Sequence, residues 1–436
     1  MTNTVSISEK YERNGWPSLD RPDLKPPNGW SLELVNSLNL IHHHELSPDG
    51  ERIAFVWERD GRSDVFTMPL SGGWPVRMSP NREKTIYWWD GPPRWSPDGL
   101  WMAFTNGGHV CVVPAGGHSL PRVVTDFADG ASSPVWMPDN HGLIVTVTRH
   151  DAFSLLLTDH DGRWPRALAD NNGGDNLEAA PSPDGRSVAY SHRPFADLNR
   201  WELRLVDLSS GETRALTGTD REKDWAPAWA PDGSAIAFLS QRSGFSELWL
   251  IRPDGQGMRQ LTHLHRDVVE FAWSTDGRTL AATVCREGAI DLLLVQANTG
   301  EMHALGTGRG CFAAPQWSPD GRYLTVEYED ATTPPDIYSI ETATGRMTQL
   351  TFSCPPVLDA HDLITPEHVR YRSFDGLEIP ALLWRPKSPN GAAVVRPHGG
   401  PADAYRFQWD GLAQYLLAKG YTFFTPNFRG SAGYGR

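Results

Sequence analysis

A short turn sequence recurs seven times along this chain and restricts its fold more than any other feature. The copies are LSPDG (46–50), WSPDG (95–99), WMPDN (136–140), PSPDG (181–185), WAPDG (229–233), WSTDG (273–277) and WSPDG (317–321). Their aspartates are 49, 41, 45, 48, 44 and 44 residues apart. A period in the forties is typical of propeller blades, each of which buries its faces against neighbouring blades. The repeat therefore predicts a seven-bladed β-propeller over residues 38–352.

Residues 224–263 show how the sequence builds one blade. Pro231-Asp232-Gly233 favours a tight turn, because proline presets φ, aspartate can bond its own backbone and glycine accepts a positive φ. The apolar run 234–240 predicts a strand that is buried on both faces, and 247–251 predicts the strand that follows it. A single PDG sequence would indicate only an ordinary turn, so the regular spacing of seven copies carries the prediction.

The repeat stops after residue 352, and the pattern of elements changes. We expect an N-terminal extension at 1–37, a linker at 353–364 and the start of a second domain at 365–436. Within that domain the sequence predicts two strands around Asp375-Gly376, then, in order, an apolar strand at 392–397, a helix at 404–419 and a strand at 421–427. This order indicates an α/β sheet with a parallel core. The predicted fold class is mainly β: a seven-bladed propeller followed by the N-terminal part of an α/β-hydrolase domain.

Charge and composition exclude several classes of protein. The formal net charge is −13. Residues 365–436 hold nine Arg/Lys and five Asp/Glu, so residues 1–364 carry the acidic excess. Such a balance argues against a nucleic-acid partner, which requires a basic surface. No apolar run approaches the ~20 residues of a membrane span, and the N-terminus lacks a signal-peptide core. The four cysteines show no CxxC spacing. We expect a cytoplasmic protein with reduced cysteines and neither a metal nor an organic cofactor.

A glycine-rich loop, His398-Gly399-Gly400-Pro401, lies between the predicted strand and helix. Backbone N–H groups in such a turn can point at an anion, because no Cβ blocks the approach. In hydrolases of this architecture, the loop supplies half of the oxyanion hole. The alternative interpretation is an ordinary glycine-rich turn.

The chain resembles the prolyl oligopeptidase family of serine peptidases, most closely its acylaminoacyl-peptidase-like branch, from about residue 30 to 436. The motifs that carry the resemblance are SFDGLEIPALLWRP (373–386), HGGP (398–401), NFRGSAGYGR (427–436) and the TolB-like WSPDG blades. The resemblance implies that the Gly400 N–H is an oxyanion donor, in a loop shared with His398 and Gly399. It also implies that Arg429 and Tyr434 border the substrate site.

The same resemblance directs attention to a nucleophile. Members of the family carry a GxSxG elbow, then an aspartate and a histidine, and these 436 residues contain no GxSxG. Ser431 lies in RGSAG, with Arg429 at the place of the first glycine, so we do not expect it to attack. The catalytic Ser, Asp and His are expected after Arg436, and this chain alone is expected to be inactive. His42-His43-His44 is interpreted as a set of packed or solvated side chains.

The leading functional prediction is a serine peptidase that acts on short peptides, of the acylaminoacyl-peptidase or oligopeptidase type, with the propeller controlling access. Its expected partners are peptide substrates and the remainder of the hydrolase domain, without nucleic acid or membrane, and homo-oligomerisation is left open. One alternative is a propeller binding module with a remnant hydrolase segment. The other is an α/β-hydrolase that cleaves esters or amides.

Overall fold

The computed structural model describes most of the chain from residue 40 onward. The described residues are 11–12, 16–17, 30–31, 34–35, 40–59, 62–79, 91–117, 119–149, 152–169, 173–197, 199–218, 222–354, 363–400 and 402–435. Most of the predicted extension at 1–37 and of the predicted linker at 353–364 lies outside them, as does Pro401. Near the N-terminus, β1 (Tyr11–Glu12) and β2 (Trp16–Pro17) form a two-stranded sheet.

Seven units of four antiparallel strands make up the described part of the repeat region. In chain order the units are β3 (Leu40–Leu46), β4 (Arg52–Arg59), β5 (Arg62–Pro69) and β6 (Val76–Arg77); β7 (Arg94–Trp95), β8 (Trp101–Asn106), β9 (His109–Pro114) and β10 (Arg122–Val123); β11 (Ala131–Trp136), β12 (Gly142–Arg149), β13 (Ala152–Asp159) and β14 (Arg166–Ala169); β15 (Gly174–Pro181), β16 (Ser187–Pro194), β17 (Glu202–Asp207) and β18 (Thr213–Ala215); β19 (Asp224–Trp229), β20 (Ile236–Ser240), β21 (Glu247–Ile251) and β22 (Arg259–Gln260); β23 (Val268–Trp273), β24 (Thr279–Arg286), β25 (Ala289–Gln296) and β26 (Met302–Gly306); and β27 (Gly310–Trp317), β28 (Tyr323–Asp330), β29 (Thr333–Glu341) and β30 (Met347–Gln349). We call these units blades 1 to 7.

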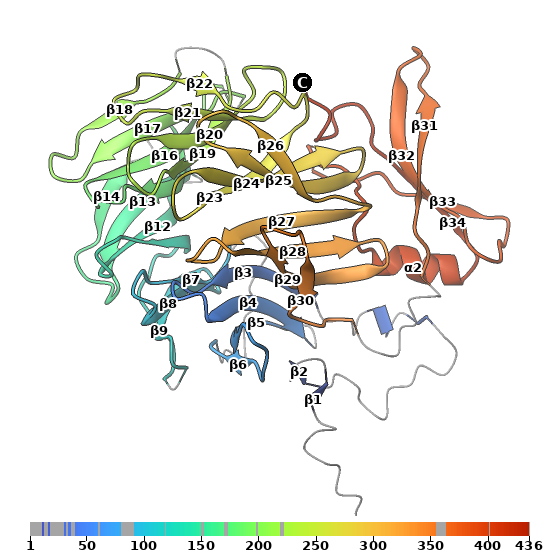
Figure 1. Cartoon of the computed structure of the whole chain (residues 1–436), viewed down its shortest axis with the longest axis horizontal. Helices are drawn as coiled ribbons and strands as arrows, with labels where there is room; N and C mark the ends of the chain where they lie inside the picture. The colour runs from blue at the N-terminus through green and yellow to red at the C-terminus, as the bar shows by residue number, and fades with distance from the viewer. Residues whose placement is uncertain are drawn as a thin grey trace, which may run out of the picture.

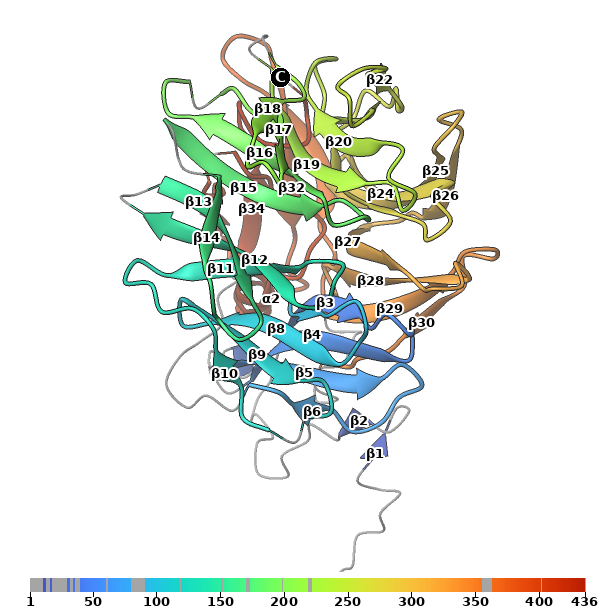
Figure 2. The ribbon, with the colours of Figure 1, turned by 90° about the vertical axis from the view of Figure 1, so that its left-hand side faces the viewer.

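The blades close into a ring. Figure 2 shows them following one another around it, and the innermost strand of each blade contacts that of the next, with β27 returning to β3. Blades 1 and 7 share an apolar cluster that includes Ile41, Phe55 and Ile337. Gln316 joins the same two blades, because its Oε1 accepts from Leu46 N at 2.6 Å and its Nε2 donates to His44 O at 2.7 Å. The predicted seven-bladed propeller is confirmed.

The histidine triplet takes part in this closure. His44 is fully buried, and its Nδ1 lies 3.2 Å from Glu327 Oε1 on β28. Its Nε2 lies 3.0 Å from Thr325 Oγ1 on the same strand. His43 adopts a φ of 55° where the register of β3 shifts against β4, which is the geometry of a β-bulge. Of the two predicted alternatives, a packed or a solvated side chain, His44 is therefore packed.

The tryptophan of the repeated turn joins adjacent blades, which gives a physical reason for its recurrence. In five of the seven copies the indole Nε1 donates to a backbone carbonyl on the innermost strand of the preceding blade. The distances to the acceptors are 3.3 Å for Trp95, 2.9 Å for Trp136, 3.0 Å for Trp229, 3.1 Å for Trp273 and 3.1 Å for Trp317. Each indole thus buries apolar area at a blade interface and satisfies its one donor there.

The Ser-Pro-Asp-Gly part of the repeat closes on itself. Ser47 Oγ donates to Asp49 Oδ1 at 2.5 Å, and Asp49 Oδ1 also accepts from Glu51 N at 3.0 Å. The serine hydroxyl, followed by that backbone N–H, lowers the pKa of Asp49. In blade 3, Asn140 takes the place of glycine with a φ of 62°, a conformation that asparagine tolerates better than most residues. Local hydrogen bonding therefore specifies this turn.

The part after the propeller is a second sheet with a helix against it. Its elements are β31 (Glu367–Arg372), β32 (Glu378–Trp384), β33 (Ala393–Val395), α2 (Gly411–Ala418) and β34 (Thr422–Pro426). The strand order is β31-β32-β34-β33, and β33 and β34 are parallel. Figure 1 shows this part beside the propeller, with α2 under the sheet. A shared core contains Leu382, Trp384, Phe407, Leu417 and Phe423. This arrangement confirms the predicted fold class.

The helix is shorter than predicted. It begins at Gly411 rather than near Ala404, and Asp410 caps it by accepting from Ala413 N at 2.9 Å. The preceding residues have their backbone N–H groups bonded elsewhere: Phe407 N donates to Gly288 O on the propeller at 2.7 Å. These tertiary bonds replace the helical ones. Among the described residues no helix has the length and apolar character needed to cross a bilayer.

Candidate active site

Gly400 lies in the loop that follows β33, and its backbone conformation suits only glycine. Its φ is +130°, and a Cβ built there would lie 2.9 Å from Ala402 N and 3.1 Å from Asp403 N. Across the described residues, neither the Gly399 N–H nor the Gly400 N–H donates to a protein acceptor. Two backbone donors are therefore unbonded at the C-terminal end of a parallel strand, which is the edge where α/β sheets bind ligands.

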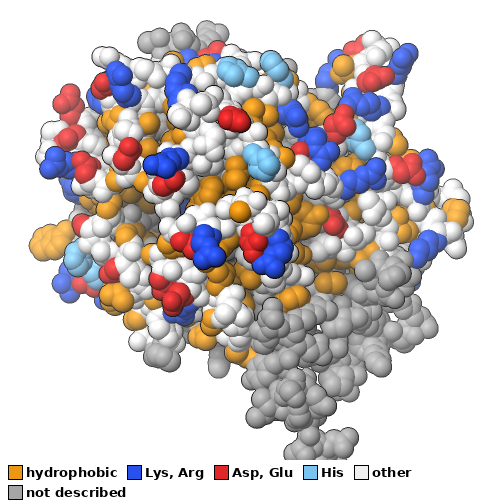
Figure 3. All heavy atoms as spheres, in the orientation of Figure 1, with side chains coloured by type: hydrophobic (Ala, Val, Ile, Leu, Met, Phe, Trp, Pro, Cys, Tyr) orange, Lys and Arg blue, Asp and Glu red, His pale blue; other side chains and the backbone are white. Residues whose placement is uncertain are grey.

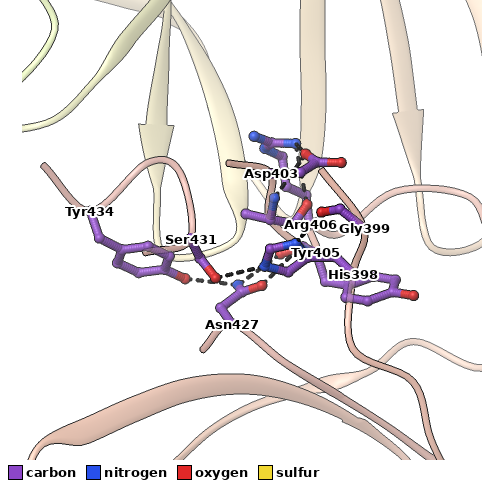
Figure 4. A network of polar contacts seen from close by, with 9 residues as sticks. His398, Gly399, Asp403, Tyr405, Arg406, Asn427, Ser431 and Tyr434 are labelled. Atoms are coloured by element: carbon purple, nitrogen blue, oxygen red, sulfur yellow. Dashed lines mark hydrogen bonds and ion pairs between the residues drawn. The ribbon is translucent and has the colours of Figure 1, made fainter. Parts of the chain in front are cut away.

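His398 connects this loop to the loop that follows β34. Its Nδ1 lies 2.7 Å from Gly399 O and its Nε2 lies 2.6 Å from Ser431 Oγ, as Figure 4 shows. Its ring stacks on Phe428, with centroids 4.2 Å apart and planes 13° from parallel. Because a carbonyl oxygen can only accept, Nδ1 carries a proton. The imidazole is thereby held by contacts on both ring nitrogens and on one face.

Sequence reasoning did not anticipate the contact between Ser431 and His398. A serine bonded to a histidine is the arrangement from which hydrolases build a nucleophile. Two features distinguish this pair from a catalytic one. First, the partner of His398 Nδ1 is a backbone carbonyl and not a carboxylate. Second, Ser431 is bonded to Phe428 within its own loop: Ser431 Oγ lies 2.6 Å from Phe428 O, and the backbone N–H of Ser431 donates to the same oxygen. Ser431 therefore closes a turn of the loop.

Asn427 is a second residue that sequence reasoning missed. It is buried just after β34, where its Oδ1 accepts from Tyr405 N at 2.7 Å. Its Nδ2 donates to Tyr405 O at 3.0 Å and to the Tyr434 hydroxyl at 2.9 Å. One amide side chain thus joins β34, the segment before α2 and the C-terminal loop, as Figure 4 shows. The available signal was a polar residue directly after the apolar run 421–426.

The two residues predicted to border the substrate site lie in different surroundings. The Tyr434 hydroxyl accepts from Asn427, which bonds to the backbone of Tyr405, and the Tyr405 ring lies 6.2 Å from that of His398. Burial raises the pKa of the Tyr434 phenol. Arg429 instead forms an ion pair with Asp375 in the turn between β31 and β32, with its guanidinium 6.0 Å from the ring of Phe374. The structure thus brings Tyr434, but not Arg429, into the network around the glycine-rich loop. Their role in substrate binding stays a prediction.

The candidate site lies where the second sheet meets blades 5 to 7. Trp409 N donates to Glu329 Oε2 on β28 at 3.0 Å, and Gly435 N donates to Asp267 Oδ2 at 3.4 Å. A Cβ on Gly433 would lie 3.2 Å from Cys285 Sγ, so the C-terminal loop rests directly on the propeller. The propeller therefore lies directly against the C-terminal loop of the site and the segment before α2.

The pH dependence of this junction can be predicted from Glu329. Burial raises its pKa to about 7; Glu327 and Asp330 also raise it, whereas the Trp409 N–H and Arg406 lower it. The unfolded chain loses this proton near 4.5, so the stability that the protonated form provides is complete below about pH 4.5 and is lost as the pH rises through 7. We expect Glu329→Gln to lose less stability than the unchanged protein between pH 5 and 8. One titrating carboxyl can change the free energy of unfolding by at most about 1.4 kcal/mol per pH unit, which is the largest difference expected between the two slopes.

Urea unfolding of both proteins at several pH values measures this difference. Glu301→Gln is the matched control, because Glu301 is an exposed carboxylate on the same propeller. Equal pH slopes for the unchanged protein and the Glu329 variant would contradict the prediction.

Comparison with known proteins supports this architecture. The family model of the TolB beta propeller domain matches residues 195–354. YuxL of Bacillus subtilis, an uncharacterised peptidase, is 25% identical over 221 residues. The match covers 47% of this chain and 30% of YuxL, so the chain spans less than a third of the length of that relative.

Two solved structures cover nearly the whole chain. A puromycin-hydrolysing peptidase of Mycobacterium tuberculosis matches with a TM-score of 0.80 at 20% identity, over 97% of this chain and 70% of that one. An acylaminoacyl peptidase of Pyrococcus horikoshii matches with a TM-score of 0.72 at 18% identity, over 94% and 68%. In the part of those peptidases that it covers, this chain has the fold of the prolyl oligopeptidase family, as its motifs predicted.

Proposed function

We propose that this chain is part of a serine-type peptidase that cleaves short peptides, of the acylaminoacyl-peptidase or oligopeptidase type. One observation carries the proposal: among the described residues the Gly400 N–H has no protein acceptor, and it lies after the C-terminal end of a parallel strand in a backbone conformation that excludes a side chain. A donor fixed in this way costs no reorganisation when charge develops on a substrate oxygen. The fold shared with peptidases supports the choice of a peptide bond as the target.

The proposed roles follow from the geometry of the loop. The Gly400 N–H stabilises the oxyanion that forms when a serine attacks the peptide carbonyl, a contact of a kind worth about 3–4 kcal/mol. His398, held by Ser431 and Phe428, keeps the loop in place. The attacking serine, its histidine base and the orienting aspartate are proposed to lie outside residues 1–436. The propeller, which lies against the C-terminal loop of the site, is proposed to admit short peptides and exclude folded proteins.

Labelling with a fluorophosphonate probe tests the proposal. We expect no labelling of residues 1–436 expressed alone, because Ser431, which contacts His398, closes a turn and the attacking serine is proposed to lie outside these residues. A protein that also contains the sequence following residue 436 in the gene is expected to label with one probe per chain. Intact mass and peptide mapping then identify the serine that carries the probe.

Ser431→Ala separates the two serines that could react. In the longer protein, this variant is expected to reach the same final labelling stoichiometry, because Ser431 closes a turn and is not the nucleophile. Labelling of residues 1–436 at Ser431, or loss of all labelling in the variant, would overturn the assignment. Absence of labelling in the longer protein would contradict the proposal that it is a serine-type peptidase.

A further inference from the structure

A surface hollow of about 580 Å³ lies on blade 6, close to the junction with the second sheet. Three arginines surround it: Arg266, Arg286 and Arg309. Its floor is apolar, since Leu293 and Ala304, a cross-strand pair of β25 and β26, both line it. A cationic rim around an apolar floor is an unusual feature in a chain whose net charge is −13.

One of the three arginines is neutralised within the hollow. Arg286 Nε lies 2.6 Å from Asp291 Oδ2 and its Nη2 lies 2.9 Å from Oδ1, so the buried carboxylate is held on both oxygens. Arg286 Nη2 also donates to Gly308 O at 2.7 Å, which fixes the loop between β26 and β27. This pair is a rigid wall with no net charge.

The other two arginines have no carboxylate partner among the described residues. Among the described residues, Arg266 and Arg309 form no ion pair and donate no hydrogen bond to the protein. The guanidinium of Arg309 lies over the ring of Phe407, 5.6 Å from its centroid, which orients it and leaves its N–H edge available. Arg266 precedes Asp267, whose carboxylate accepts from Ser246 N and from Gly435 N. Two guanidinium groups, of which that of Arg309 is oriented by Phe407, therefore line the hollow without an ion-pair partner among the described residues.

We propose that this arginine pocket binds the carboxylate of a small organic anion. Guanidinium groups bind carboxylates through paired, charge-assisted hydrogen bonds, and the floor of Leu293 and Ala304 suits an apolar stem. Phosphate shares this chemistry but offers no apolar part to the floor. The free terminal carboxylate of a short peptide is an anion of this kind, and this choice of ligand rests on the proposed peptidase function.

The pocket adjoins the loops of the candidate site. Arg309 stacks on Phe407, which belongs to the segment before α2, and Asp267 beside Arg266 holds Gly435 of the C-terminal loop. Figure 3 shows Lys and Arg side chains, with Asp and Glu side chains among them, along this border between the propeller and the second sheet. A ligand bound here contacts the propeller at the same junction that carries the glycine-rich loop.

Calorimetric titration of the full chain at low ionic strength tests the pocket without any turnover. The probes are N-acetyl-L-phenylalanine, its uncharged amide and inorganic phosphate. We expect the acid to bind at least about 10-fold more tightly than the amide, because each charge-assisted hydrogen bond contributes at that scale. Phosphate is expected to bind more weakly than the acid.

Two double variants with the same charge change separate the pocket from general electrostatics. Arg266→Gln with Arg309→Gln is expected to weaken binding of the acid by about 30-fold or more. Arg278→Gln with Arg322→Gln removes two exposed arginines that pair only loosely with neighbouring aspartates at 3.9 Å, and is expected to leave binding within about 2-fold. Circular dichroism checks that both variants are folded.

Three results would overturn the proposal: equal binding of the acid and its amide, unchanged binding in the Arg266/Arg309 variant, or no binding of the acid. Phosphate that binds more tightly than the acid and is lost in that variant would show an inorganic oxyanion site instead. Because no reaction is measured, failure here leaves the peptidase proposal standing, and failure of labelling leaves the pocket standing.

Discussion

Gly400→Pro is expected to lower kcat of the catalytically complete protein by about 10²–10³-fold, because proline removes the N–H proposed to stabilise the oxyanion. KM is expected to change little, since this donor acts on the transition state and not on the bound peptide. Steady-state kinetics with a chromogenic peptide measures the loss. Proline cannot adopt the φ of +130° at this position, so the loop itself also shifts.

Two further variants separate the lost donor from the disturbed loop. Gly400→Ala keeps the N–H but places a Cβ 2.9 Å from Ala402 N, so an intermediate loss of kcat is expected. Gly391→Ala, in the turn before β33, carries the same kind of positive φ (+85°) in open space and is expected to cost only about 1 kcal/mol of stability. Turnover that is unchanged in Gly400→Pro would show that the loop is not an oxyanion hole.

Gln414→Leu is expected to produce the largest loss of stability, about 3 kcal/mol or more, because it leaves several buried polar groups without partners. Gln414 lies on α2 with 3% of its surface exposed. Its Oε1 accepts from Ile364 N at 3.0 Å, and its Nε2 donates to Ile364 O at 2.9 Å and to Ala331 O at 2.8 Å. One amide therefore holds together the helix, the segment that leads into β31 and blade 7.

Urea unfolding of the full chain measures the free energy of unfolding of this variant. Leu412→Ala on the same helix is the control, since Leu412 is 39% exposed and its truncation is expected to cost less than about 0.5 kcal/mol. Limited proteolysis gives a second readout, because loss of the clamp frees the segment around residue 364 for cleavage. A Gln414→Leu variant within 0.5 kcal/mol of the unchanged protein would contradict the role of this residue.

The seven blades were predictable because their signal is local and repeated. A PDG turn forms from bonds within about five residues, such as Ser47 Oγ to Asp49 Oδ1, so its spacing reports directly on strand lengths. The parallel sheet after the propeller was predictable for a similar reason, since an apolar strand, a glycine-rich loop, a helix and another strand follow in order.

The start of the helix and the network of the site were decided by tertiary structure. The interval 404–410 has a helical pattern, yet its N–H groups bond to Asn427, Gly288 and Glu329, which are distant in sequence. Local propensity carries no information about such partners, and tertiary bonds override it.

The pairing of His398 with Ser431 follows from strand register. Val395 on β33 lies opposite Phe424 on β34 in a parallel pair, so the residues that leave the two strands, His398 and Asn427, emerge at the same edge of the sheet. The order of residues alone places a glycine-rich loop after an apolar strand. Only the register of β33 against β34 decided which side chains meet there, because that register depends on packing between segments about thirty residues apart.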